Sequence, residues 1–191
     1  MDQLNDKPDG RKNVIDGKRY LLKNIITHPD YLYTYMAHSD VALLQLRDEI
    51  EYSDNVQPIC LPNGQEPSHG ERCHITGWGY TGWGLGRVLS RHWQHATIPI
   101  VNFDRCNLIY YKLLKEDVHM CAGDVVNGGV DACDGDAGGP LTCQDPETKV
   151  YYLAGVTSAG LSQCGMMRGH LGIYTRMVTF ENWIRDTVMN A

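Results

Sequence analysis

The chain has 191 residues, enough for one domain or two small barrels with a sizeable core. Its net charge of −6 argues against nucleic acid as a partner, because proteins that bind nucleic acid usually carry a basic patch. No apolar run approaches the length that crosses a bilayer, so we also expect no membrane span.

Polar residues occupy the start of the chain. Residues 1–18 are rich in Gly, Asp and Asn and indicate a solvated loop, since their acidic residues match no calcium-ligand spacing. The segment Met1–Lys7 also lacks the apolar core of a signal peptide. Either the start of the protein is missing or it is made without an export signal, and we favour the first.

Two apolar-rich runs follow, at residues 19–26 and 41–46, and both predict strands. The turn His28-Pro29-Asp30-Tyr31 lies between them. Residues 49–70 contain Pro, Gly and Asn and indicate a connection between two structural units.

From Arg72 onward, short strands alternate with turn signals, which favours an all-β barrel. We expect strands at residues 95–100, 119–122, 141–143, 150–158 and 172–176, and a short helix within 103–113. At the end of the chain, four apolar residues recur at helical spacing and predict an amphipathic helix with Thr179 as its cap. They are Phe180, Trp183, Ile184 and Val188. We expect Trp183 to pack in the core.

Seven cysteines suggest disulfides and an oxidising compartment, so we expect an extracellular, secreted protein. Spacing alone does not fix their connectivity. The chain has no Cys-Xaa-Xaa-Cys pair, which argues against zinc. We therefore expect neither a metal nor a cofactor.

The most informative stretch is Asp131-Ala132-Cys133-Asp134-Gly135-Asp136-Ala137-Gly138-Gly139-Pro140. Its glycines permit backbone conformations that a Cβ atom would block. Such a turn can point two backbone N–H groups into one space and hold a developing negative charge there. An ordinary solvated acidic loop is the alternative.

This stretch resembles the nucleophile loop of the trypsin/chymotrypsin family of serine endopeptidases, Gly-Asp-Ser-Gly-Gly-Pro, with Ala137 in place of the serine. Other family segments follow in the family's order at residues 40–44, 57–62, 76–79, 120–123 and 172–175. The resemblance implies an all-β fold of two antiparallel barrels and a C-terminal helix.

The first barrel is expected to be only partly present. We assign residues 1–48 to its remnant, 49–70 to the connection, 71–176 to the second barrel and 177–191 to the C-terminal helix. The chain contains no match for the family's opening strands or for the Thr-Ala-Ala-His-Cys segment that carries the catalytic histidine. A barrel without its opening strands exposes a sheet edge and an apolar face, which favours aggregation or pairing with a partner.

The family pattern also implies three disulfides: Cys73–Cys143, Cys106–Cys121 and Cys133–Cys164. It leaves Cys60 unpaired. In relatives with such a cysteine the partner lies in an N-terminal segment or a light chain. A second chain or segment linked through Cys60 is therefore a possible partner.

For catalysis, the resemblance assigns Asp40 as the carboxylate that orients the histidine, supported by Ser158. It assigns the N–H groups of Gly135 and Ala137 to the oxyanion hole. Ala137 has no oxygen to attack a carbonyl, so no acyl-enzyme can form. None of the eight histidines lies in an Ala-His-Cys context, and we assign none of them a catalytic role. We expect the chain to be inactive.

Asp136 matches the carboxylate that, in the family, pairs with the amino group made by activation cleavage. That amino group has no counterpart in these residues. Because a buried unpaired carboxylate is costly, we expect Asp136 to turn outward or to find another donor. We further expect a zymogen-like, poorly formed oxyanion loop.

The residues that correspond to the specificity pocket match trypsin-like members more closely than the catalytic residues do. Asp131 corresponds to the pocket floor that attracts Lys or Arg, with Ala132 beside it and Ser158 nearby. Gly160 and Gly172 correspond to small wall residues. Ala159 stands where the family usually has tryptophan, which reduces the shelf for neighbouring substrate residues.

Three functions fit these features. The first is a non-catalytic homologue that binds a protein or peptide containing Lys or Arg. The second is an endopeptidase that cleaves after Lys or Arg, seen here as an incomplete chain or with a Ser-to-Ala change. The third is a non-functional gene fragment.

Overall fold

Six antiparallel strands form a closed barrel in the computed structural model, which describes residues 19–34, 36–81, 88–160 and 168–190. The order around the barrel is β10-β7-β6-β3-β8-β9. The strands are β3 (Arg72–Gly77), β6 (Gln94–Val101), β7 (His119–Ala122), β8 (Pro140–Gln144), β9 (Tyr151–Gly160) and β10 (Gly172–Arg176). The predicted all-β class is confirmed.

The barrel is filled by side chains that alternate along its strands. In β8, Leu141 and Cys143 are buried while their neighbours are partly exposed, the period-two pattern of a strand with one face in a core. Ile98 of β6, Tyr152 of β9 and Tyr174 of β10 pack in the same cluster. Burial of this apolar area is the main stabilising contribution to the fold.

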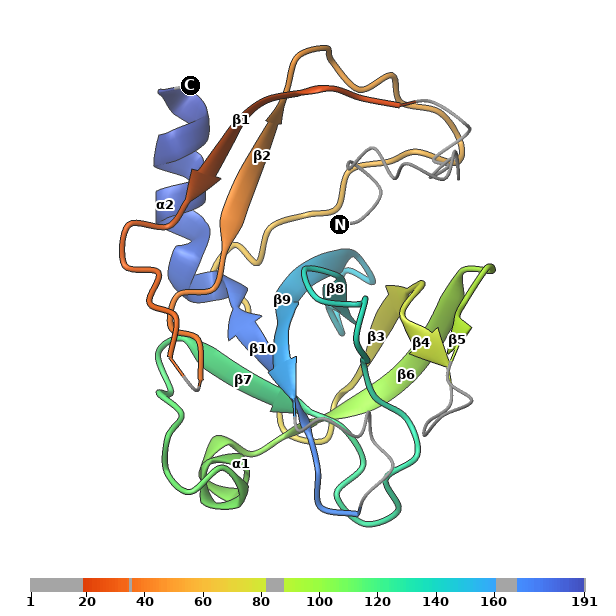
Figure 1. Cartoon of the computed structure of the whole chain (residues 1–191), viewed down its shortest axis with the longest axis vertical. Helices are drawn as coiled ribbons and strands as arrows, with labels where there is room; N and C mark the ends of the chain where they lie inside the picture. The colour runs from red at the N-terminus through yellow and green to blue at the C-terminus, as the bar shows by residue number, and fades with distance from the viewer. Residues whose placement is uncertain (1–18, 35, 82–87, 161–167, 191) are drawn as a thin grey trace.

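The first two strands form a separate antiparallel pair: β1 (Leu22–Thr27) and β2 (Ala42–Leu46). They lie beside the C-terminal helix α2 (Met177–Met189), where Val41 and Leu43 pack against Phe180 (Figure 1). Within the described ranges no third strand joins this pair, and Ile25 is 64% exposed. In the described part of the chain, this pair therefore has unpaired edges and an exposed apolar side chain.

The short helix predicted within residues 103–113 is present as α1 (Phe103–Ile109). Asn102 caps it by accepting a hydrogen bond from the backbone N–H of Arg105 at 3.2 Å. The helix stops because Tyr111 and Lys112 adopt positive φ angles of 55° and 61°, outside the right-handed helical region.

The prediction that Thr179 caps α2 is wrong. The helix begins at Met177, directly after β10, and its cap residue Arg176 makes no side-chain cap bond. The Thr179 hydroxyl instead donates to the carbonyl of Asp117. Trp183 packs against the core, as predicted, with its ring edge near His28. Val188 is 64% exposed, so the apolar stripe is narrower than predicted.

The sequence Thr-Gly-Trp-Gly occurs at residues 76–79 and again from Thr81, which is the last residue of a short strand β4 (Tyr80–Thr81). This strand pairs with β5 (Val88–Leu89) in a small two-stranded sheet that the sequence did not predict. Residues 82–84 of the copy lie outside the described residues.

Two of the expected disulfides are present. Cys73–Cys143 joins β3 to β8, and Cys106–Cys121 joins α1 to β7. Cys133 is also disulfide-bonded, and its expected partner, Cys164, lies outside the described residues.

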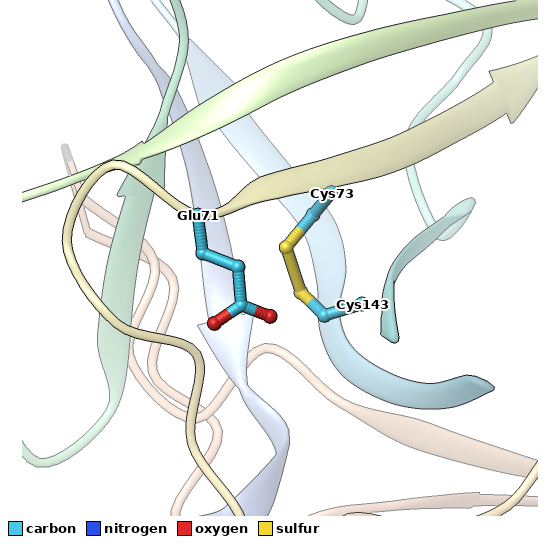
Figure 2. A group of neighbouring side chains, drawn as sticks. All are labelled: Glu71, Cys73 and Cys143. Atoms are coloured by element: carbon cyan, nitrogen blue, oxygen red, sulfur yellow. A yellow bond between two sulfur atoms is a disulfide. The ribbon is translucent and has the colours of Figure 1, made fainter. Parts of the chain in front are cut away.

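Glu71 lies beside the Cys73–Cys143 bridge (Figure 2). This trio is the only grouping of three metal-ligating side chains in the described part of the chain. Both sulfurs are committed to the disulfide, so they are not available as thiolate ligands. The trio therefore provides no metal site.

Candidate functional site

The glycine-rich loop of residues 131–139 leads directly into β8. Gly135 and Gly138 have φ angles of +96° and +79°, which L side chains rarely adopt. The N–H of Gly139 donates to the carbonyl of Asp136 at 2.9 Å and closes the turn. The loop thus has the conformation for which its glycines are needed.

Asp136 is held inside this loop and does not turn outward. Its Oδ1 accepts a hydrogen bond from the backbone N–H of Gly79 at 2.7 Å, and its Oδ2 accepts one from Cys133 at 3.0 Å. Hydrogen bonds to an ionised acceptor are stronger than neutral ones. Two backbone donors therefore offset part of the cost of placing this carboxylate in the loop.

From Gly135 to Gly138, every second backbone N–H group donates a hydrogen bond within the protein. Asp136 donates to the Cys133 carbonyl at 2.9 Å, and Gly138 donates to the Thr157 carbonyl at 2.8 Å. Gly135 and Ala137 donate to no protein acceptor among the described residues, and both are exposed. These two N–H groups are thus open to an external oxygen atom.

Asp40 lies where the unit formed by β1 and β2 meets the barrel. Its Oδ2 accepts a hydrogen bond from the hydroxyl of Ser158 in β9 at 2.6 Å. Its backbone carbonyl accepts a second bond from the hydroxyl of Thr175 in β10, at 2.8 Å. In the described part of the chain no histidine ring forms a hydrogen bond with the Asp40 carboxylate.

Asp131 is the most perturbed carboxylate of the site. Burial raises its pKa to about 7; the N–H of Ala132, which donates to Asp131 Oδ1 at 2.8 Å, lowers the pKa, and the charge of Asp136 raises it. A Cβ atom at position 172 would lie 2.5 Å from Asp131 Oδ1. Glycine at 172 is therefore required for β10 to approach this carboxylate so closely.

The two expected wall residues are direct neighbours across strands. Gly160 at the end of β9 pairs with Gly172 at the start of β10. A Cβ atom at Gly160 would meet nothing within 4 Å, so the space beside it is open. The hydroxyl of Tyr174 is buried near Asp131 with no hydrogen-bond partner among the described residues. The site thus combines the carboxyl group of Asp131, the unpaired hydroxyl of Tyr174 and the two glycines at positions 160 and 172, which have no side chains.

A cavity of about 490 Å³ lies along the same loop. Its lining includes Asp131, Asp136, Gly79, His95 and Thr157. Two of the three carboxylates of the loop, Asp131 and Asp136, therefore border one space that also reaches β3 and β6.

Three contacts of the site were not predicted: the Gly79 bond to Asp136, the Thr175 bond to Asp40 and the placement of Tyr174. Each joins segments far apart in the sequence, and strand register sets their approach. The local sequence carries no signal for the first. Only the Gly-Ile-Tyr-Thr segment near Gly172 could have suggested Tyr174 and Thr175.

The chain was compared with known proteins. The family model described as Trypsin matches residues 3–184. Transmembrane protease serine 9 of Rattus norvegicus is 38% identical over 174 residues, covering 91% of this chain and 16% of the relative. Melanization protease 1 of Drosophila melanogaster is 35% identical over 193 residues, covering 96% and 46%. Ovochymase of Halocynthia roretzi is 32% identical over 165 residues, covering 85% and 10%.

The chain therefore spans less than half the length of each of these relatives. Among its described residues, neither helix has the length and apolar character needed to cross a membrane.

Proposed function

Because the chain belongs to the trypsin family of serine proteases, we propose that it keeps the family's cleft for binding and does not cleave peptides. Its ligand is a protein or peptide segment with an exposed Lys or Arg side chain, which enters beside Asp131. The observation that carries this proposal is the Asp131 carboxylate, partly buried beside Gly172 in the same loop that has Ala137 at the nucleophile position.

Two features support the lack of cleavage. Ala137 presents a methyl group where the family's mechanism needs a hydroxyl. The Asp40 carboxylate accepts a bond from Ser158 and has no described histidine to orient. An oxyanion hole alone, even with free N–H groups at Gly135 and Ala137, provides no nucleophile.

The electrostatics of the pocket support a cationic ligand. Burial disfavours the ionised form of Asp131, and a guanidinium or ammonium group placed beside it would replace the lost solvation. The partly buried Asp136 adds a second negative charge to the same cavity. A neutral or anionic side chain would have no such electrostatic attraction to the two carboxylates.

Benzamidine, a small amidine cation, is the probe for this pocket. We expect it to bind weakly in isothermal titration calorimetry, and Asp131→Asn to abolish the binding because the charge that attracts the amidinium is gone. Asp134→Asn is the matched control, since Asp134 is an exposed acid in the same loop. Equal binding by the Asp131→Asn variant and the parent chain would refute the assignment.

Benzamidine binding should also depend on pH. The pKa of Asp131 is about 7, so this carboxyl is largely ionised at pH 8 and takes up a proton as the pH falls through 7. Affinity should therefore be roughly thirtyfold weaker at pH 5.5 than at pH 8, in proportion to the ionised fraction. Calorimetry in buffers of equal ionic strength measures the ratio, and a flat profile would contradict an ionised Asp131 as the binding group.

An endopeptidase that cleaves after Lys or Arg is the alternative. The bond between Ser158 and Asp40 and the free N–H groups of the glycine-rich loop favour it, because both belong to the family's catalytic arrangement. Transcript sequence upstream of Met1 distinguishes the two proposals. A Thr-Ala-Ala-His-Cys segment there, with serine at position 137 in other copies of the gene, would support the enzyme.

The partner and the location are also proposals. Cys60 is exposed and free, so it can form a disulfide with a second chain or with a further segment of the protein. The two disulfides and the disulfide-bonded Cys133 are consistent with an extracellular protein, since such bonds persist in oxidising compartments. We therefore place the protein outside the cell.

A further inference from the structure

Two histidines face each other on the outer surface of the barrel. His74 in β3 and His95 in β6 lie on one face of the sheet, because His95 is two residues from Thr97, the register partner of His74. Their ring planes differ by 22°, with centroids 5.0 Å apart. The Nδ1 atom of His74 and the Nε2 atom of His95 are 2.9 Å apart and share a hydrogen bond, whose donor depends on the tautomers of the two rings.

Neighbouring side chains hold both rings in place. Trp93 stacks on His95 with an interplanar angle of 16° and a centroid distance of 5.9 Å. Tyr151 lies against His74 at 5.7 Å, and the Thr97 hydroxyl is 3.1 Å from His74 Nδ1. Because these contacts restrict the rotamers of both rings, a ligand that contacts both nitrogens would cost less side-chain entropy on binding.

The separation of the two nitrogens also fits a metal ion that would replace the hydrogen shared between them. Imidazole binds divalent transition metals at about 2.0–2.1 Å. At that bond length, two nitrogens at a right angle lie about 2.9 Å apart, whereas a tetrahedral angle places them about 3.3 Å apart. The observed 2.9 Å matches the right angle of square-planar and octahedral ions.

We propose that His74 and His95 form a two-histidine site for a divalent transition-metal ion that prefers right-angled nitrogen ligands, such as Ni²⁺ or Cu²⁺. The remaining coordination positions face solvent, since His95 is exposed and His74 is partly exposed. His74 does not line the cavity that Asp131 borders, and nothing in the proposed binding of Lys or Arg requires either histidine. His95 borders the cavity that Asp131 also lines, so a bound ion would lie at its rim.

The experiment is a titration of the full chain with Ni²⁺ by calorimetry at pH 7.5, with Cys60 blocked by iodoacetamide. We expect one site, and we expect His74→Asn and His95→Asn each to weaken binding at least tenfold, because each removes one of two ligands. His92→Asn is the matched control, since His92 is an exposed histidine just before β6. Thermal unfolding without metal shows that each variant is folded. Equal affinity in the control and the two ligand variants would overturn the proposal.

A spectroscopic measurement tests the ligand set directly. The electron paramagnetic resonance spectrum of one equivalent of Cu²⁺ should show hyperfine coupling to two imidazole nitrogens, and to one in the His95→Asn variant. A spectrum with one nitrogen in the parent chain would overturn the site. The Asp131→Asn variant should bind Ni²⁺ with unchanged affinity, so the metal site and the cation pocket can fail independently.

Discussion

A fluorogenic peptide amide with arginine at the cleaved position should remain intact with this chain and equally with its Ala137→Ser variant. The substitution returns a hydroxyl to the glycine-rich loop but supplies no base. Catalysis of this kind needs an imidazole between the hydroxyl and the carboxylate, and no described histidine contacts Asp40. Loss of the base alone costs about as much as loss of the whole triad, on the order of a millionfold in turnover.

The release of the fluorophore over several hours measures this, with catalytic amounts of trypsin as the positive control. Benzamidine binding by the Ala137→Ser variant shows that the pocket is intact. The Asp131→Asn variant purified in the same way reveals any contaminating protease, because a contaminant does not depend on that substitution. Hydrolysis by the Ala137→Ser variant that a fluorophosphonate blocks would show that a base is present, and hydrolysis by the parent chain that Asp131→Asn abolishes would overturn the proposal of an inactive chain.

The hydrogen bonds of Asp40 and Asp136 hold the proposed binding cleft together, and they do not depend on peptide cleavage. The Ser158 bond to Asp40 and the Thr175 bond to its carbonyl tie the segment before β2 to β9 and β10. The Asp136 bonds fix the loop against Gly79. These bonds stabilise the fold whether or not a peptide bond is broken. Their presence is therefore compatible with the proposed binding and does not require turnover.

Strands were predicted well where alternating apolar and polar residues are bounded by residues typical of turns. The bounds of β7 and β10 were predicted to the residue. The cap of α2 was predicted wrongly because β10 runs into the helix without a loop. The Thr179 hydroxyl instead donates a hydrogen bond to the backbone carbonyl of Asp117. Local capping preferences do not account for such tertiary contacts.

Parts of the site could not be predicted from local sequence. The bond between Gly79 and Asp136 joins residues 57 positions apart, and the facing nitrogens of His74 and His95 depend on the register of β3 and β6. A one-residue shift in that register would place the two rings on opposite faces of the sheet. Motif resemblance locates the loop, but packing decides what its carboxylates contact.

The disulfide between Cys73 and Cys143 should be the largest single covalent contribution to stability among the described bridges. It closes a loop with a sequence separation of 70, against 15 for Cys106–Cys121. Because a crosslink mainly restricts the unfolded chain, its effect grows with loop length. Replacing both cysteines by alanine should lower the free energy of unfolding by about 4 kcal/mol for the first pair and about 3 kcal/mol for the second.

The second pair is a close control, because all four cysteines are at most 1% exposed and differ chiefly in the loop they close. Urea unfolding followed by tryptophan fluorescence measures both variants against the parent chain. The first variant should also lose benzamidine binding at a lower urea concentration, since β8, which carries Cys143, directly follows the loop that holds Asp131 and Asp136. A smaller loss for the Cys73–Cys143 variant than for the control would mean that loop length does not set the stability of this barrel.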